Sequence, residues 1–410
     1  VENPKYRRFR YGVQVNSLGL TEQQPENNVY RILIEMLAVT LSKNARARAV
    51  QLPAWNEALG LPRPWDQQWS MRMQQIMAFE TDLLEYEDLF DGNPTIEAKV
   101  ARLKDEARHE LASLDALGGA IEAIGYMKSR LVESNTQRLN RIASKETTVV
   151  GVNKFTAGEP SPLTSGDAGI MTVDPAVEQD QVDRLNAWRS ARDDASVATA
   201  LRSLRAAARA GENIMPASIA AAKAGVTTGE WAAQMRLIYG EYRGPTGVAH
   251  GVSNQSEGLD EIRDAVDLVS QKLGRRVGFL MGKPGLDGHS NGAEQIAARA
   301  RDCGMKIAYD GIRLTPEQLI ASVQEHKPHV IGLSILSGSH IPLVEDMMKR
   351  LQLAQLDNIP VVVGGIIPQE DMIRLTAMGV AKIYTPKDFE LNAIMMDIVN
   401  LADPTDLAAE

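Results

Sequence analysis

The sequence contains a single cysteine, Cys303, among its 410 residues. One cysteine cannot form an internal disulfide, and such scarcity suits a reducing compartment such as the cytoplasm. No apolar run is long enough to cross a membrane, so we expect no membrane span. No signal peptide is recognisable, but the first residue is Val1 rather than Met, so this second absence excludes little. The chain also lacks a basic cluster and has a formal net charge of −9, so nucleic acid is not an expected partner.

The residues that are present are typical of a globular protein. Hydrophobic residues make up 44% of the chain and charged residues 24%. A length of 410 residues predicts two or three domains. We expect a first domain over residues 1–155, a connector and helical linker region over 156–257, and a last domain over 258–410.

Apolar runs of strand type alternate with helical periodicity throughout residues 258–401. The expected strands lie near 276–281, 305–309, 329–334, 360–364 and 381–384, and a helix follows each of them. This order predicts an α/β fold with a five-stranded, doubly wound (flavodoxin-like) parallel sheet. The loops after the first, third and fourth strands should meet at one edge of that sheet, where doubly wound folds bind their ligands.

The loop after the first of these strands, MGKPGLDGHSNG at 281–292, contains Lys283, Asp287 and His289 among four glycines. A neutral imidazole binds metals through one ring nitrogen, while the other nitrogen commonly donates its proton to a carboxylate. Asp287 lies two residues before His289 and can accept that proton, and Lys283 can keep Asp287 ionised. The glycines allow a bulky ligand to approach the backbone, where a β-carbon would collide with it. These residues therefore suggest a site with one metal-binding histidine.

Two other interpretations of this loop stay open on the residues alone. A histidine near an aspartate in a glycine-rich loop is more often a polar loop contact than a metal ligand. A phosphate-binding loop is the other rival, although GKPGLDGHS lacks the G-x-x-x-x-G-K-[ST] order that such loops require.

Asp287-x-His289-x-x-Gly292 resembles the D-x-H-x-x-G signature of the cobalamin-binding domain of adenosylcobalamin-dependent mutases. Lys283 stands where these mutases place a lysine. Three further stretches match the family in order: Ser334-Ile335-Leu336 matches S-x-L, Gly364-Gly365 matches G-G, and Tyr384-Thr385-Pro386 matches Y-T-P. The resemblance implies that His289 replaces the cofactor's own benzimidazole as the lower cobalt ligand, and that the displaced nucleotide tail occupies a slot. The implied cofactor-binding residues are Gly288, His289, Ser290, Gly292, Ser334, Leu336, Gly338, Gly364, Gly365, Tyr384 and Thr385.

The first part of the chain also alternates strands and helices. We expect strands at 8–16 and 46–52, a strand or a chain returning to the core at 147–155, helices at 29–42 and 68–80, and two helices within 94–143 that break around Gly118-Gly119. The stretches RFRYGVQVN, LPAWNEALGLP and VVGVNKF resemble the late barrel segment of acyl-CoA mutases. A complete (β/α)8 barrel takes about 250 residues. We therefore expect only the C-terminal part of a TIM barrel here.

Departures from the methylmalonyl-CoA branch of this family at 14–18, 47–53 and 387–388 favour its ethylmalonyl-CoA branch. The implied reaction is the radical interconversion of ethylmalonyl-CoA and methylsuccinyl-CoA. The family's radical-shielding tyrosine, the arginine that binds the substrate carboxylate and the catalytic histidine lie earlier in the barrel, and we find no counterpart of them in this chain. The catalytic candidates are therefore Lys283, Asp287 and Glu80. Glu80 lies in a stretch that approaches the barrel mouth in the family, although a solvated carboxylate at a helix end is the commoner interpretation.

Residues 156–180 are rich in Pro, Gly, Ser and acid, and they predict an exposed connector. The alanine-rich stretch 181–240 predicts about three short helices, divided near Gly211 and Gly225, and a second connector follows at 241–256. The remaining histidines are expected to be packed or exposed residues without a catalytic role: His109, His250, His326, His329 and His340.

The resemblance implies adenosylcobalamin, with its cobalt, as the cofactor and a coenzyme A thioester as the substrate. It also implies that the catalytic unit needs an N-terminal barrel segment and that the enzyme is a homodimer. Two alternatives stay open: a methylmalonyl-CoA mutase, and a cobalamin-carrying subunit without its own turnover. The partial barrel argues against a pure carrier, because a cobalamin module alone needs no barrel strands.

Overall fold

The computed structural model describes residues 2–7, 9–159, 161, 170–171, 174–246, 248, 258–388 and 390–405. The chain divides into two compact units, one made of Val1–Met171 with Pro245–Glu410 and the other of Thr172–Gly244. In the described part of the chain, no helix is long and apolar enough to cross a membrane.

A five-stranded parallel sheet forms the centre of the C-terminal part, in the order β4-β3-β5-β6-β7. Its strands are β3 (Gly278–Gly282), β4 (Lys306–Ala308), β5 (Val330–Ser334), β6 (Val361–Gly364) and β7 (Lys382–Tyr384). Every residue of β3 and β5 is buried, as expected for parallel strands covered on both faces. The predicted five-stranded, doubly wound sheet is therefore confirmed.

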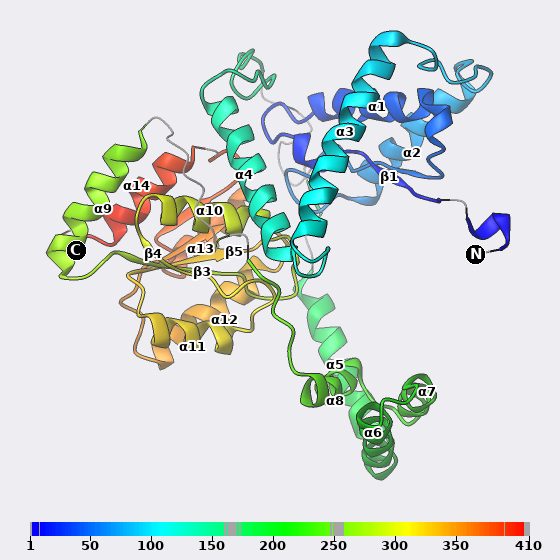
Figure 1. Ribbon diagram of the computed structural model, residues 1–410. Helices are drawn as coiled ribbons and strands as arrows, with labels where there is room; N and C mark the ends of the chain where they lie inside the picture. The colour runs from blue at the N-terminus through cyan, green and yellow to red at the C-terminus, as the bar shows by residue number, and fades with distance from the viewer. Residues whose placement is uncertain are drawn as a thin grey trace. The chain divides into compact units, whose positions relative to one another are not determined.

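Helices cover both faces of this sheet and bury a separate apolar core on each face (Figure 1). One face carries α9 (Leu259–Leu273), α10 (Asn291–Asp302) and α14 (Leu391–Leu401). The other carries α11 (Pro316–His326), α12 (His340–Leu353) and α13 (Gln369–Ala377). Local sequence starts and stops these helices: Thr315 and Gln318 form a capping box at α11, and Gly274 ends α9 in a left-handed conformation.

The N-terminal part contains two short parallel strands, β1 (Val13–Gln14) and β2 (Val50–Gln51). Its helices are α1 (Asn27–Leu41), α2 (Pro64–Phe79), α3 (Pro94–Ala116) and α4 (Ile124–Ala143). Trp55 is fully buried against Ile32 and Met36 of α1 and methionines of α2. The buried carboxylate of Asp66 accepts hydrogen bonds from Trp55, Asn56 and Arg63, which fixes the start of α2.

Two features of this part differ from the sequence prediction. The strands expected at 8–16 and 46–52 form the predicted parallel order but pair over only two residues each. Residues 147–155 form turns with one isolated bridge between Val150 and Lys154, because no neighbouring strand among the described residues pairs with them. A strand requires a partner, and the pattern of a single segment does not reveal whether one is present.

The second unit contains α5 (Pro175–Ala191), α6 (Asp194–Arg209), α7 (Met215–Lys223) and α8 (Thr228–Tyr239). The prediction of about three helices over 181–240 was therefore too low, because the break between α5 and α6 contains no glycine or proline. Asp193 makes that break by accepting hydrogen bonds from the N–H groups of Ala195 and Ser196. The predicted connector at 156–180 ends earlier than expected, because α5 already begins at Pro175, and part of it lies outside the described residues. Most of the second connector, including His250, also lies outside the described residues.

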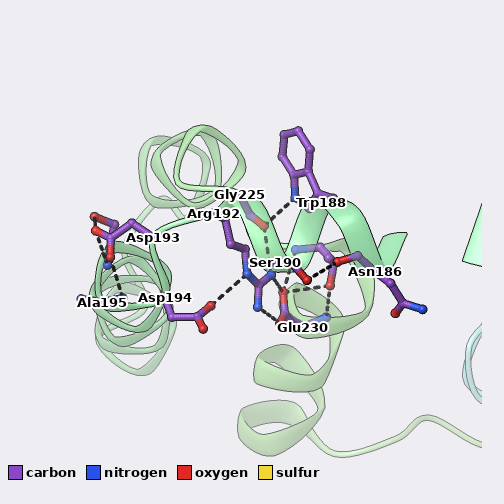
Figure 2. Close-up of polar contacts among 11 residues, drawn as sticks. Asn186, Trp188, Ser190, Arg192, Asp193, Asp194, Ala195, Gly225 and Glu230 are labelled. Atoms are coloured by element: carbon purple, nitrogen blue, oxygen red, sulfur yellow. Dashed lines mark hydrogen bonds and ion pairs between the residues drawn. The ribbon is translucent and has the colours of Figure 1, made fainter. Parts of the chain in front are cut away.

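Arg192 links the ends of three helices in this second unit (Figure 2). Its guanidinium donates two hydrogen bonds to Glu230 at the start of α8, at 2.8 and 2.7 Å, and one to the carbonyl of Gly225. Trp188 of α5 donates to the same carbonyl. The paired guanidinium lowers the pKa of Glu230 to about 2. This contact holds together a unit whose buried apolar core is small.

Candidate functional site

The loop between β3 and α10 lies at the carboxyl edge of the sheet, and backbone hydrogen bonds attach it to the loop after β4. The N–H of Gly285 donates to the carbonyl of Leu314 at 3.0 Å, and the N–H of Leu314 donates to the carbonyl of Lys283 at 3.1 Å. Gly285 has a φ of 82°, which favours glycine at this turn. The loop therefore begins from a fixed backbone position.

Lys283 and Asp287 form a buried ion pair beneath this loop. The Lys283 side chain is fully buried, and its Nζ lies 2.6 Å from Oδ2 of Asp287, whose side chain is 4% exposed. Burial opposes ionisation of Asp287, but hydrogen bonds from Lys283 and His289 outweigh it and hold the pKa of this carboxyl well below its usual range. Asp287 is therefore a fixed negative charge at neutral pH.

The side chain of His289 contacts the same carboxylate and extends towards solvent. Its Nδ1 lies 2.6 Å from Oδ1 of Asp287, and its backbone N–H donates to the same oxygen at 3.0 Å. Because an ionised carboxylate only accepts hydrogen bonds, Nδ1 carries the proton and the lone pair of Nε2 is free. The imidazole side chain is 78% exposed. This arrangement presents one nitrogen ligand of fixed tautomer at the sheet edge.

Asp287 also joins this loop to the one after β5. Its Oδ2 accepts a hydrogen bond from the backbone N–H of Leu336 at 3.3 Å, and Lys283 approaches the carbonyl of Ser334 at 3.4 Å. Two motifs about 50 residues apart in sequence therefore meet on one carboxylate. The sequence predicted that these loops would share an edge, and the fold brings them into contact.

The glycines at this edge differ in what surrounds them. A β-carbon on Gly365 would lie 1.9 Å from the carbonyl oxygen of Ile335, so this position admits no side chain. A β-carbon on Gly364 or Gly292 would meet no atom within 4 Å. Gly365 is therefore required by packing, whereas Gly364 and Gly292 leave open space at the edge where a ligand can approach.

The other predicted site residues lie on neighbouring segments. Ser290 is the N-cap of α10, and Gly338 precedes α12. A β-carbon on Gly288 would lie 3.1 Å from Nη2 of Arg313. The hydroxyl of Tyr384 donates to Asp397 of α14 at 3.2 Å, and the backbone N–H of Thr385 donates to Asp388 at 2.7 Å. Burial, followed by the charge of Asp397, raises the pKa of Tyr384.

Glu80 is not joined to this group. It caps the C-terminus of α2 through its backbone N–H, and its side chain is exposed with no hydrogen bond to another described residue. His109 is exposed on α3. His340 is buried at the start of α12, with its Nε2 2.7 Å from Asp371.

The sequence analysis did not identify Arg313, which follows β4 and lies against Gly288. A usable signal was present, because the loop after β4 ends at the same sheet edge as the loops that carry the motifs.

The side chains at this site suit a metal ion whose other ligands come from a cofactor rather than from the protein. Among the described residues, no three His, Cys, Asp or Glu side chains converge on a point that could hold a metal ion. His289 offers one nitrogen, and the glycine-lined edge beside it is open. A metal already held by a large planar ring fits this combination of one protein ligand and an open edge.

The sequence of this chain is similar to those of several known proteins. Residues 1–241 match the methylmalonyl-CoA mutase family, and residues 277–388 match the B12 binding domain. The ethylmalonyl-CoA mutase of Cereibacter sphaeroides is 71% identical over all of this chain, which covers 63% of that protein. The ethylmalonyl-CoA mutase of Methylorubrum extorquens is 59% identical over 98% of this chain, which covers 59% of it. The methylmalonyl-CoA mutase of Escherichia coli is 31% identical over 98% of this chain, which covers 56% of it. The chain thus spans about three-fifths of the length of these relatives.

Proposed function

This chain belongs to the methylmalonyl-CoA mutase family, and from that membership we propose that it is part of an adenosylcobalamin-dependent mutase that interconverts ethylmalonyl-CoA and methylsuccinyl-CoA. The proposed substrate rests on a difference in sequence identity. The chain is 71% and 59% identical to two ethylmalonyl-CoA mutases but 31% identical to a methylmalonyl-CoA mutase. The observation that supports the cofactor is the exposed imidazole of His289, held by a buried carboxylate inside the stretch that matches the B12 binding domain.

His289 is the proposed lower ligand of the cobalt, through Nε2. Asp287 accepts the proton of Nδ1, which fixes the ring orientation and makes the imidazole a stronger ligand. Lys283 keeps Asp287 ionised and attaches it to the end of β5. When bound, adenosylcobalamin supplies an organic radical through homolysis of its cobalt–carbon bond. The chain's own residues orient the cofactor and present a nitrogen ligand of fixed tautomer.

The edge between the loops after β3, β5 and β6 is the proposed slot for the displaced nucleotide tail. Gly292 and Gly364 leave open space there, and Gly365 allows the loop after β6 to pack against Ile335. The remaining residues proposed to line the slot are Gly288, Ser290, Ser334, Leu336, Gly338, Tyr384 and Thr385. Glu80 is proposed separately, as a residue that approaches the substrate or the adenosyl group from α2.

The wider organisation is part of the same proposal. We assign residues 1–155 to the end of the barrel, 156–257 to a connector with helices, and 258–410 to the cobalamin-binding domain. An N-terminal barrel segment outside this chain completes the catalytic unit and binds the coenzyme A thioester, and the enzyme is a cytoplasmic homodimer. The chain's coverage of only 63% and 59% of the two ethylmalonyl-CoA mutases supports the need for that segment.

A side-by-side turnover assay tests the substrate. The chain is joined to the N-terminal barrel segment, loaded with adenosylcobalamin, and given ethylmalonyl-CoA or methylmalonyl-CoA. One methylene in a fitted apolar pocket changes specificity by about 10–200-fold, so we expect kcat/KM for ethylmalonyl-CoA to be higher by that order. The 410-residue chain alone is the control and should bind cobalamin without isomerising either substrate. A preference for methylmalonyl-CoA would move the protein to the other branch.

A further inference from the structure

Arg313 lies in the loop between β4 and α11, directly before Leu314. The backbone of Leu314 forms hydrogen bonds with Lys283 and Gly285, in the loop that carries His289. These two hydrogen bonds fix Arg313 beside the loop that carries His289. Its backbone φ is 60°, in the left-handed region that a side chain other than glycine seldom adopts. Such strain persists where the surrounding structure enforces it, and it concentrates at functional sites.

The guanidinium of Arg313 carries an unneutralised charge over this loop. Its Nη2 lies 3.1 Å from the position that a β-carbon on Gly288 would take, so the cation rests against the backbone next to His289. Within the described part of the chain, the Arg313 side chain forms no hydrogen bond and no ion pair, and the residue is exposed. The carboxylate of Asp287 is already bonded to Lys283, His289 and Leu336. The donors of Arg313 are therefore free to bind a ligand.

The strand order indicates which part of a bound cobalamin would face Arg313. Because β3 lies between β4 and β5, Arg313 is on one side of the His289 loop, while Ser334 and Gly364 are on the other. The nucleotide tail, with the phosphodiester, is assigned to that other side. The part of the cofactor left facing Arg313 is the rim of the corrin ring, which carries amide side chains. Amide carbonyl oxygens accept hydrogen bonds, and a guanidinium offers five donors in a planar fork.

We propose that Arg313 binds amide carbonyl groups on the rim of the corrin, on the side away from the nucleotide tail. This inference rests on the proposed function, because it requires cobalamin at His289. Arg313 would then hold the cofactor on the side of His289 opposite to the proposed slot for the nucleotide tail. Arg313 is thus a cofactor-binding residue in a loop that the sequence motifs do not include.

The test is a titration of the 410-residue chain with hydroxocobalamin and with aquocobinamide, which lacks the nucleotide tail and the phosphodiester. The variants are Arg313→Gln, Arg313→Lys and the control Arg275→Gln, which removes an exposed arginine before β3, at the opposite end of the strands. A lost hydrogen bond to a charged donor weakens binding by about tenfold or more, so we expect Arg313→Gln to weaken both ligands by that order. Arg313→Lys should restore part of the affinity, and Arg275→Gln should bind like the wild type.

Three results would overturn the proposal, and they are distinguishable. Unchanged affinities in Arg313→Gln would show that the side chain does not contact the cofactor. A loss of affinity confined to hydroxocobalamin would place Arg313 on the phosphodiester. Titrations at several salt concentrations test the same point. Only an ion pair between Arg313 and phosphate would make the ratio of wild-type to variant affinity fall as the salt concentration rises. A wild-type chain that binds neither ligand would refute the proposed cofactor itself, and the role of Arg313 with it.

Discussion

Replacing Asp287 with asparagine removes one negative charge and almost no volume. The ammonium of Lys283 is fully buried, 2.6 Å from Oδ2 of Asp287 and 3.4 Å from the carbonyl of Ser334. In Asp287→Asn this ammonium loses its counter-ion. The amide of asparagine also lacks the charge that keeps the proton on Nδ1 of His289. The substitution therefore affects both the stability of the loop and the quality of the cobalt ligand.

The two effects have different sizes. Removing one partner of a buried ion pair costs about 3–5 kcal/mol, because the remaining charge is left buried. We expect the lower end, a loss of about 3 kcal/mol in the free energy of unfolding, because the ammonium of Lys283 keeps its hydrogen bond to the carbonyl of Ser334. Losing the hydrogen-bond partner of a metal-ligating histidine lowers metal affinity by about 10–100-fold. Cobalamin affinity should fall by that order even where the variant is fully folded.

The double variant Lys283→Met with Asp287→Asn separates the two effects. It leaves neither charge of the Lys283–Asp287 pair, so the free energy of unfolding should return most of the way to the wild-type value. Cobalamin affinity should stay low, because Nδ1 of His289 still lacks its carboxylate. Denaturant unfolding measures the first quantity and absorbance titration with hydroxocobalamin the second. Spectra of cob(II)alamin bound to nitrogen-15-labelled protein report whether the axial nitrogen belongs to the protein, with His289→Ala as the reference for its loss.

Wild-type affinity in a folded Asp287→Asn variant would refute the role of this carboxylate in orienting His289. Wild-type stability in the same variant would show that Lys283 has another acceptor of equal strength. If the double variant recovered both stability and affinity, Asp287 would matter only as the counter-ion of Lys283.

Two further predictions concern a glycine pair and an acid-sensitive contact. Gly365→Ala should destabilise the fold by about 1–3 kcal/mol or more, because its β-carbon would lie 1.9 Å from the carbonyl oxygen of Ile335. Gly364→Ala, with open space at its β-carbon, should unfold like the wild type but bind cobalamin more weakly; equal unfolding midpoints for the two variants would contradict the packing argument. The hydrogen bond from Arg192 lowers the pKa of Glu230 from 4.5 to about 2, so its contribution to stability is present above about pH 4.5 and is lost as the pH falls towards 2. Helicity measured by circular dichroism across this range should decline less steeply in Glu230→Gln, and parallel curves would exclude the pair as a source of acid sensitivity.

The sequence alone determined those features that depend on neighbouring residues. Continuous apolar runs separated by helical periodicity predicted five buried parallel strands, because parallel strands covered on both faces have that pattern. The spacing of Lys283, Asp287 and His289 was also sufficient for their contacts, since two to four residues of chain keep these side chains within reach of one another. Gly365 and Gly364 were both recognised as part of a motif, but the sequence did not show that packing requires only the first.

The tertiary structure decided the features that depend on distant partners. Whether residues 147–155 form a strand depends on a pairing segment, and among the described residues they form turns instead. The flavodoxin-like fold class predicted that β3 and β5 are adjacent in the sheet, but only the tertiary structure shows the hydrogen bond from Leu336 to Asp287 that this adjacency allows. Arg313 belongs to no motif and lies against Gly288 because two backbone hydrogen bonds join the loop after β4 to the loop after β3. Local chemistry is encoded by spacing along the chain, whereas contacts across a sheet edge are set by strand order.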